Sequence, residues 1–423
     1  MIVNFLSAVL KRLFPPGSFG RRLLYQLRAD TGKWIFTSRA TPHLPIEADI
    51  EHFASWVQDQ GAKQIILIMA STMLIESEGQ RSTNFALEFS RRGIPCIFGY
   101  WRWKKNQWLP QDRMADGILQ IPVDTIAEWP EIVMRRFTNV EKVVLFEFPH
   151  PSFFKILSEA HAAGWITIYD VIDDWGEFQR VGQAHWYEQP MERHLLQNTD
   201  AVTVVNQTLG KAISDLGINN AESIANGTFL GIEAVDEERH LERGEITIGY
   251  FGYMAGAWFD WELLSETAAA HPTWLFYLIG YGEDPAKKGL PANLRLLGKR
   301  PRSQLASLAS NWDVAMIPFK QERLASGADP IKTYEYLAMN LPVVVAGVSP
   351  PAGAEDLVRR ANGADEFAQA IKRAAEEGDR FLEARAAFAA ENTWVHRVDQ
   401  LLSMLERGDQ RIDEKRSLFN RAV

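Results

Sequence analysis

The sequence has very little cysteine and no long apolar run, and both absences limit what the chain can be. Cys96 is the single cysteine among 423 residues, which excludes an internal disulfide framework and a metal site built from clustered thiolates. No apolar run approaches the roughly 20 residues that a transmembrane helix needs. The apolar residues 1–10 also lack the leading basic region and the small-residue cleavage site of a secretory signal. We therefore expect a globular protein of the reducing cytoplasm.

Several functional signatures are missing as well. The formal net charge of −9 argues against a general nucleic-acid binder. The histidines show no metal-ligand spacing, and no Gly-x-Ser-x-Gly nucleophile elbow occurs. The glycines at 249, 252 and 256 lack the Gly-x-Gly-x-x-Gly spacing of a dinucleotide fingerprint, which is poor evidence for NAD. We expect neither a bound metal nor a nicotinamide cofactor.

Positive charge is concentrated in two places. Residues 1–30 contain five basic side chains and no acid before Asp30, beside apolar residues at roughly helical spacing. Such an arm can bind an anionic membrane surface, or it can be a partly packed arm with solvated arginines. In residues 100–108, tryptophans alternate with cations. This loop is either an interfacial anchor, a sugar-stacking loop or a set of tryptophans packed under a long loop.

Short apolar runs alternate with helix-length segments along most of the chain. They lie at 64–69, 95–98, 143–148, 165–169 and 201–205, and again at 246–251, 274–279, 294–297, 314–317 and 343–346. This alternation predicts βαβ units and parallel sheets. The acidic stretch 233–245 is typical of a linker between the two groups of apolar runs. We expect the chain beyond about residue 364 to be helical. We expect an N-terminal domain over 1–240 with the basic arm 1–30, a C-terminal domain over 246–395, and a helix over 396–423 that returns to the first domain.

One stretch combines a predicted helix start with charged side chains. Asp329 is a suitable N-cap and Pro330 suits the first helical position. Lys332 and Glu335 are three residues apart, so they project together from one face. A helix start with a lysine in its first turn suits a diphosphate, and a glutamate one turn on suits the vicinal hydroxyls of a ribose. The alternative is an amphipathic helix with a solvated Lys/Glu pair.

Context favours the binding interpretation. The segment Pro330-Ile-Lys-Thr-Tyr-Glu-Tyr-Leu-Ala338, followed by Leu341-Pro-Val-Val344, resembles the nucleotide-binding motif of the "group 1" glycosyltransferases of the GT-B fold, family 4 and its relatives. Residues 246–264 resemble the first strand and loop of their C-terminal domain. Weaker similarities occur at 278–282, 311–318 and 169–175, so the resemblance covers 246–347 in order and the N-terminal half in outline.

The resemblance implies an α/β protein with two Rossmann-like, parallel-sheet domains that face a cleft, and a C-terminal helical tail. It also implies these donor-binding residues: Gly252, Tyr253, Gly282, Arg323, Lys332 and Glu335. The sequence departs from the family in two ways. The loop after Gly252 carries no cation, although relatives often place an arginine and a lysine there, and the first glutamate of the paired-glutamate motif is replaced by Gly327. The segment from Gly280 to Gly282 either lines the cleft or forms a turn.

Three carboxylates near the end of the predicted strand 165–169 face the expected cleft: Asp170, Asp173 and Asp174. They can orient or deprotonate an acceptor hydroxyl, or Asp173 or Asp174 can cap the next helix. Their spacing does not match a metal-holding Asp-x-Asp. His150 lies where family members often place a histidine that touches the sugar, although a loop histidine with no role fits equally. The catalytic candidates are therefore Asp173, Asp174 and His150.

These observations predict a metal-independent glycosyltransferase, a hexosyltransferase by resemblance, that uses a nucleotide-diphosphate sugar of UDP or GDP type. Its acceptor would be a saccharide or lipid-linked saccharide in cell-surface polysaccharide synthesis, at the cytoplasmic face of an anionic membrane. The resemblance favours retention of anomeric configuration over inversion. Two alternatives stay open: a non-catalytic GT-B relative that acts as a binding subunit, and another two-domain α/β nucleotide-sugar enzyme.

Overall fold

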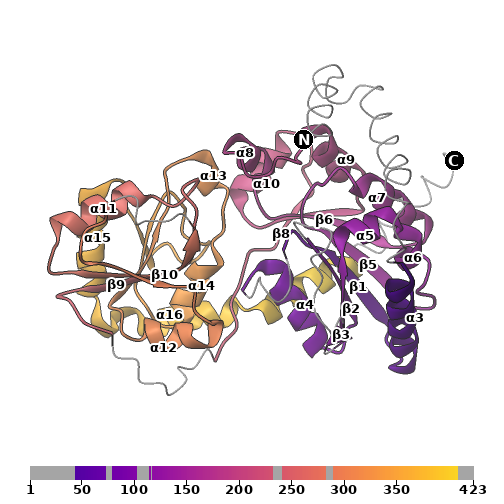
Figure 1. The fold of residues 1–423 in the computed structure, drawn as a ribbon, viewed down its shortest axis with the longest axis horizontal. Helices are drawn as coiled ribbons and strands as arrows, with labels where there is room; N and C mark the ends of the chain where they lie inside the picture. Colours follow the sequence, from indigo (N-terminus) through magenta and orange to yellow (C-terminus); the bar gives the residue numbers. More distant parts are fainter. Residues whose placement is uncertain are drawn as a thin grey trace.

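A computed structural model describes residues 43–72, 79–101, 114–115, 117–231, 241–282 and 289–407. These residues form two lobes, each built on one β-sheet covered by helices (Figure 1). The expected α/β architecture with two separate sheets is confirmed. The basic arm 1–30, most of the tryptophan-rich loop 100–108 and residues 408–423 lie outside the described part of the chain.

The N-terminal sheet has eight strands in the order β3-β4-β2-β1-β5-β6-β7-β8. All neighbouring strands are parallel except β3 and β4, which are antiparallel. The strands are β1 (Gln64–Met69), β2 (Cys96–Tyr100), β3 (Met114–Ala115), β4 (Ile118–Pro122), β5 (Glu141–Phe146), β6 (Ile166–Val171), β7 (Ala201–Val204) and β8 (Glu222–Ser223). The sequence pattern missed β3 and β8, which are two residues long, and β4, because Gln120 interrupts its apolar run.

Both faces of this sheet are buried, which explains its continuous apolar runs. In β1, Ile65 and Leu67 belong to one core cluster, whereas Ile66 and Ile68 belong to a second cluster on the opposite face. The helices of this lobe are α3 (His43–Asp59), α4 (Arg81–Arg91), α5 (Val123–Glu128), α6 (Pro130–Met134), α7 (Phe153–Ala162), α8 (Trp175–Arg180), α9 (Gln189–Asn198) and α10 (Gln207–Ser214). Helices α3 and α7 pack on the first face and α4 on the second.

The C-terminal sheet has six parallel strands in the order β11-β10-β9-β12-β13-β14. They are β9 (Thr247–Met254), β10 (Leu275–Gly282), β11 (Leu294–Gly298), β12 (Val314–Pro318), β13 (Val343–Ala346) and β14 (Val358–Arg360). The helical segments are α11 (Trp261–Ala270), η2 (Arg302–Gln304), α12 (Leu305–Ala309), α13 (Arg323–Ser326), α14 (Ile331–Ala338), α15 (Ala364–Ala375), η3 (Gly378–Phe381) and α16 (Leu382–Glu391). The strand order reverses between β9 and β12, as it does between β1 and β5 in the other sheet. Ligands of such sheets bind in the crevice at the carboxyl ends of the strands, at these reversal points.

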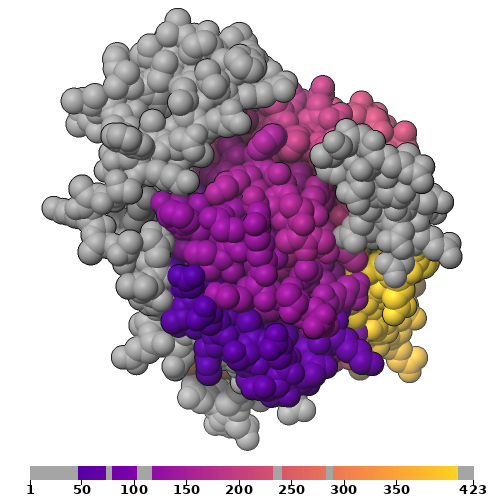
Figure 2. Space-filling view, turned by 90° about the vertical axis from the view of Figure 1, so that its right-hand side faces the viewer, coloured from indigo at the N-terminus to yellow at the C-terminus, as the bar shows by residue number. Residues whose placement is uncertain are grey.

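The chain crosses between the lobes at two places that lie side by side. Thr228 and Thr393 form a parallel bridge, with the Thr228 N–H donating to the Asn392 carbonyl over 3.0 Å. A helix over residues 394–407 then packs on the N-terminal lobe, where Trp394 is fully buried against Phe85. Figure 2, which faces that lobe, shows these yellow C-terminal residues beside the indigo and purple ones. We propose the domain bounds 1–240, 246–395 and 396–423 from the sequence pattern. In the structure, the helix that returns to the N-terminal lobe begins at residue 394.

None of the helices in the described residues combines the length and the apolar character that crossing a bilayer requires.

Candidate functional site

The carboxyl ends of β9 and β10 form a backbone surface that only glycine permits. Gly252 and Gly280 are register partners, with φ of +143° and +146°, and Gly282 has φ of +148°. A Cβ atom on Gly280 would lie 1.8 Å from the Gly252 carbonyl oxygen, and one on Gly282 would lie 2.5 Å from the Met254 oxygen. Gly280 and Gly282 therefore continue strand β10 rather than form a turn. Glycine is required at these positions because the neighbouring strand, or Lys332 at Gly252, occupies the space that a side chain would need.

Lys332 projects from the first turn of α14 over this surface. A Cβ atom on Gly252 would lie 2.7 Å from Lys332 Cε and 3.1 Å from Nζ. The ammonium lies 5.6 Å from the centre of the Tyr250 ring. Burial lowers the pKa of Lys332, and the nearby Glu335 carboxylate opposes that shift. Lys332 forms no ion pair within the described residues, so its charge is available to an anion.

Glu335 lies one turn further along α14 and is almost completely buried, with 4% of its surface exposed. Its Oε1 atom accepts a hydrogen bond from Arg302 Nη2, in a salt bridge. Arg302 was not predicted as a site residue, because 33 residues separate it from Glu335 and only the tertiary structure brings them together. Lys332 and Glu335 therefore do not pair with each other on a solvated surface. They occupy one face of α14 as predicted, each in a separate environment.

The start of α14 differs from the prediction. Pro330 occupies the N-cap position and no side chain caps the helix. Asp329 instead accepts a hydrogen bond of 2.7 Å from the Asn226 N–H in the N-terminal lobe, and one of 3.0 Å from the Tyr334 hydroxyl. Burial raises the pKa of Asp329, and these hydrogen bonds oppose the shift. Asp329 is thus a contact between the lobes, because a partner from the other domain competes successfully for its carboxylate.

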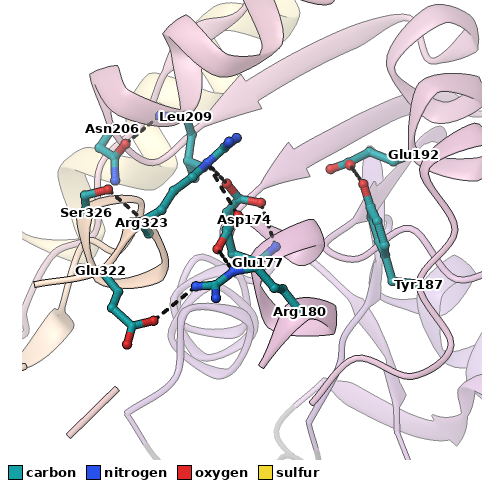
Figure 3. A network of polar contacts seen from close by, with 10 residues as sticks. All are labelled: Asp174, Glu177, Arg180, Tyr187, Glu192, Asn206, Leu209, Glu322, Arg323 and Ser326. Atoms are coloured by element: carbon teal, nitrogen blue, oxygen red, sulfur yellow. Dashed lines mark hydrogen bonds and ion pairs between the residues drawn. The ribbon is translucent and has the colours of Figure 1, made fainter. Parts of the chain in front are cut away.

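The two lobes also meet through α8 and α13, as Figure 3 shows. Asp174 caps α8 by accepting from the Glu177 N–H over 3.0 Å, and its other oxygen lies 3.3 Å from Arg323 Nε. Arg180 reaches back to Glu322 over 3.0 Å. The predicted catalytic residue Asp174 and the predicted donor ligand Arg323 therefore contact each other between the two lobes. A donor would have to compete with Asp174 for Arg323.

Asp173 has a different environment from its neighbour. It accepts no hydrogen bond from any residue that the structure describes, and it lies just beyond β6, at the carboxyl edge of the sheet. Burial, followed by the charge of Asp174, raises the pKa of Asp173 to about 7. A carboxyl group with this pKa exchanges a proton readily near neutral pH. Asp170, by contrast, belongs to β6 itself rather than to the loop after it.

His150 lies within a group of aromatic side chains beyond β5. Its ring centre is 5.2 Å from that of Trp101 and 5.7 Å from that of Trp186. Nδ1 accepts a hydrogen bond from the Ser152 N–H over 3.2 Å, which places the proton of a neutral ring on Nε2. On the other lobe, Tyr253 is 41% exposed and its ring lies 4.9 Å from that of Tyr281. Groups of aromatic rings therefore occur on both lobes.

Two further acids are buried in the N-terminal lobe: Asp170, which we expected to face the cleft, and Glu147, which was not predicted as a site residue. Arg81 holds Asp170 through contacts of 2.7 and 3.1 Å, and Thr203 donates to the same carboxylate over 2.6 Å. Glu147 follows β5 directly and is fully buried, and burial followed by the charge of Asp170 raises its pKa to about 8. The available signal was an acid directly after an apolar strand run. No group of three or more His, Cys, Asp or Glu side chains in the described residues is arranged to hold a metal ion.

Comparisons with known proteins identify relatives of the chain and of its fold. Residues 246–377 match the family model described as "Glycosyl transferases group 1". The chain is also 22% identical over 215 residues to TuaH of Bacillus subtilis (strain 168), a glycosyltransferase named for teichuronic acid biosynthesis. That match covers 45% of this chain and 52% of TuaH, so the chain spans about half the length of this relative.

Solved structures with the same fold include that of Anabaena Alr3699/HepE in complex with UDP and glucose. It has a TM-score of 0.61 and 13% identity, and the match covers 81% of this chain and 99% of that one. A glycosyltransferase from Rickettsia africae has a TM-score of 0.56 and 14% identity, with coverage of 82% and 98%. These likenesses show the GT-B fold over 81–82% of the chain.

Proposed function

We propose that this chain, a GT-B protein whose C-terminal domain belongs to the group 1 glycosyltransferases, transfers a sugar from a nucleoside-diphosphate donor to a hydroxyl of a saccharide or lipid-linked saccharide. The observation that carries the proposal is the arrangement of Lys332 and Glu335 beside the glycines at the carboxyl ends of β9 and β10. An unpaired ammonium suits a diphosphate, and a carboxylate one turn away suits the ribose hydroxyls.

The donor would lie against the C-terminal lobe, with Gly252, Tyr253 and Gly282 under it. UDP is the nucleotide we propose, because HepE, which has the same fold, was solved with UDP and glucose. Lys332 and the amide groups at the start of α14 would stabilise the departing diphosphate electrostatically, so the reaction needs no metal ion. Arg323 would also contact the diphosphate once the donor replaces Asp174 as its ion-pair partner.

The acceptor would lie against the N-terminal lobe. Asp173 is the carboxylate that we propose for its hydroxyl, because Asp174 already caps α8 and pairs with Arg323. His150 and the aromatic rings around it would contact a sugar ring. Retention is the stereochemical outcome we propose from the family resemblance, with Asp173 orienting the hydroxyl. The configuration of the product, determined by NMR, distinguishes this from inversion with Asp173 as the base.

Cell-surface polysaccharide assembly is the proposed process, supported by the relationship to TuaH. In this proposal the enzyme works in the cytoplasm, on the inner face of the membrane, where a lipid-linked acceptor would be presented.

A thermal-shift screen against UDP, GDP, dTDP, CMP and NAD tests the donor class. A ligand present at about one hundred times its dissociation constant adds about 2.7 kcal/mol to the free energy of unfolding, which raises the melting temperature visibly. We expect UDP to raise it and Lys332→Ala to abolish the effect. Lys372→Ala, which removes an exposed lysine of α15, is the matched control. A shift with NAD alone would overturn the proposal, and donor binding without turnover would indicate a non-catalytic relative.

A further inference from the structure

The loop that follows β9 lacks the cations that donor-binding loops of this type often carry, but the structure brings a lysine to it from another strand. Lys320 comes two residues after β12, and its Nζ atom donates a hydrogen bond to the carbonyl oxygen of Gly256. The Lys320 N–H also donates to the Trp258 carbonyl over 2.8 Å. The loop is therefore fastened to the end of β12 by both the main chain and the side chain of one residue.

This contact occurs at the reversal point of the C-terminal sheet. Strands β9 and β12 are neighbours, but they pair only through Ile248 with Val314 and Gly249 with Ala315. Beyond these pairs the strands diverge toward their carboxyl ends. The loop from β9 returns to the end of β12 through an antiparallel bridge between Phe259 and Phe319. Lys320 thus stands at the crevice where sheets of this order bind ligands.

Lys332 and Lys320 both lie near the carboxyl end of β9. Lys332 lies beside Gly252 within the strand, and Lys320 contacts Gly256 in the loop that follows it. The ammonium of Lys332 also lies 5.9 Å from the ring of Phe319, which precedes Lys320 in the chain. The neighbouring arginines of the cleft are already paired, Arg302 with Glu335 and Arg323 with Asp174. Neither lysine forms an ion pair with a carboxylate in the part of the chain that the structure describes.

We propose that Lys320 is a second diphosphate-binding residue, which supplies from β12 the positive charge that the loop after β9 lacks. This inference rests on the proposed function. Two lysines near the carboxyl end of β9 would hold both phosphates of the donor, whereas the ribose would lie further along α14 at Glu335. A lysine that only fastened the loop would need its hydrogen bond to Gly256 but not its charge.

Isothermal titration calorimetry with UDP and with uridine separates these roles. Lys320→Gln keeps a hydrogen-bond donor for Gly256 and removes the charge, and Lys320→Arg keeps both. We expect Lys320→Gln to weaken UDP binding by about ten- to a hundredfold, the usual effect of losing one charge-assisted hydrogen bond, and to leave uridine affinity unchanged. Lys320→Arg should keep most of the UDP affinity of the wild type. Lys372→Gln, which alters an exposed lysine, should leave the affinities for both UDP and uridine unchanged.

Each outcome has a definite meaning. Equal UDP affinity in Lys320→Gln and the wild type, with an unchanged melting temperature, would overturn the role of Lys320 but leave the proposed function intact. A parallel loss of UDP and uridine affinity would show that Lys320 only shapes the loop, which also overturns the inference. If the wild-type protein binds no nucleoside diphosphate at all, the proposed function itself fails.

Discussion

Glu335 provides the sharpest test of the donor site, because its two carboxylate oxygens have different surroundings. Arg302 contacts Oε1, whereas Oε2 accepts no hydrogen bond from any residue that the structure describes. A ribose hydroxyl can therefore bind Oε2 without breaking the salt bridge. A hydrogen bond to a charged group contributes about 1.5–3 kcal/mol, so removing it should weaken binding by about ten- to a hundredfold. Glu335→Gln keeps the size of the side chain and removes its charge.

The assay is a thermodynamic cycle that combines this substitution with a change in the ligand. UDP and its 2′-deoxy and 3′-deoxy forms are titrated calorimetrically into the wild type and into Glu335→Gln. We expect the wild type to lose about ten- to a hundredfold in affinity with at least one deoxy form. Glu335→Gln should bind UDP more weakly than the wild type by the same factor, and it should bind UDP and that deoxy form with equal affinity. Such non-additivity is the signature of direct contact.

The same ratio of UDP to deoxy affinity in both proteins would refute the assignment of Glu335 to the ribose. Glu355→Gln, at an exposed glutamate of the same lobe, is the matched control and should leave every affinity unchanged. A lower melting temperature in Glu335→Gln without ligand would indicate that the salt bridge to Arg302 is mainly structural.

Three further predictions follow from the other polar residues. Asp173→Asn should lower turnover by about ten- to a hundredfold at unchanged donor affinity, which is the effect of losing one charge-assisted hydrogen bond. The turnover of the wild type should fall below pH 7, because the pKa of Asp173 is raised to about 7 and protonation removes its charge. Full turnover of the variant and a flat pH profile of the wild type would contradict this role. Asp174→Ala should lower the free energy of unfolding, measured by urea denaturation, by about 0.5–2 kcal/mol, because the cap of α8 is lost. Loss of the exposed ion pair with Arg323 should add little to this cost. Loss of turnover at unchanged stability would instead indicate that Asp174 is catalytic. Asp329→Ala leaves two hydrogen-bond donors, the Asn226 N–H and the Tyr334 hydroxyl, without their partner. It should therefore lower the free energy of unfolding by about 2–4 kcal/mol. A decrease below about 1 kcal/mol would contradict the role of Asp329 as a contact between the lobes.

Most of the fold could be predicted from the sequence, because strands buried on both faces are read as short apolar runs. The runs at 64–69 and 343–346 coincide with β1 and β13. Two of the strands that were missed have little apolar pattern, because β8 has two residues and β14 contains two arginines, whereas Gln120 hides the apolar pattern of β4. Helix α14 was also predicted, but its cap was not. Asp329 has the chemistry of an N-cap, yet its carboxylate bonds to Asn226, which is 103 residues away in the sequence.

The sequence by itself determined the alternation of strands and helices and the spacing that puts Lys332 and Glu335 on one face of a helix. These features depend on residues within one or two turns or strands, so periodicity and backbone preference specify them. Only the tertiary structure decided the partners of the charged groups: Arg302 with Glu335, Arg323 with Asp174, and Lys320 with the loop at Gly256. The physical reason is that sheet order and the packing of the two lobes decide which loops and helix ends become neighbours, and a charged side chain pairs with whatever group then lies within about 4 Å of it.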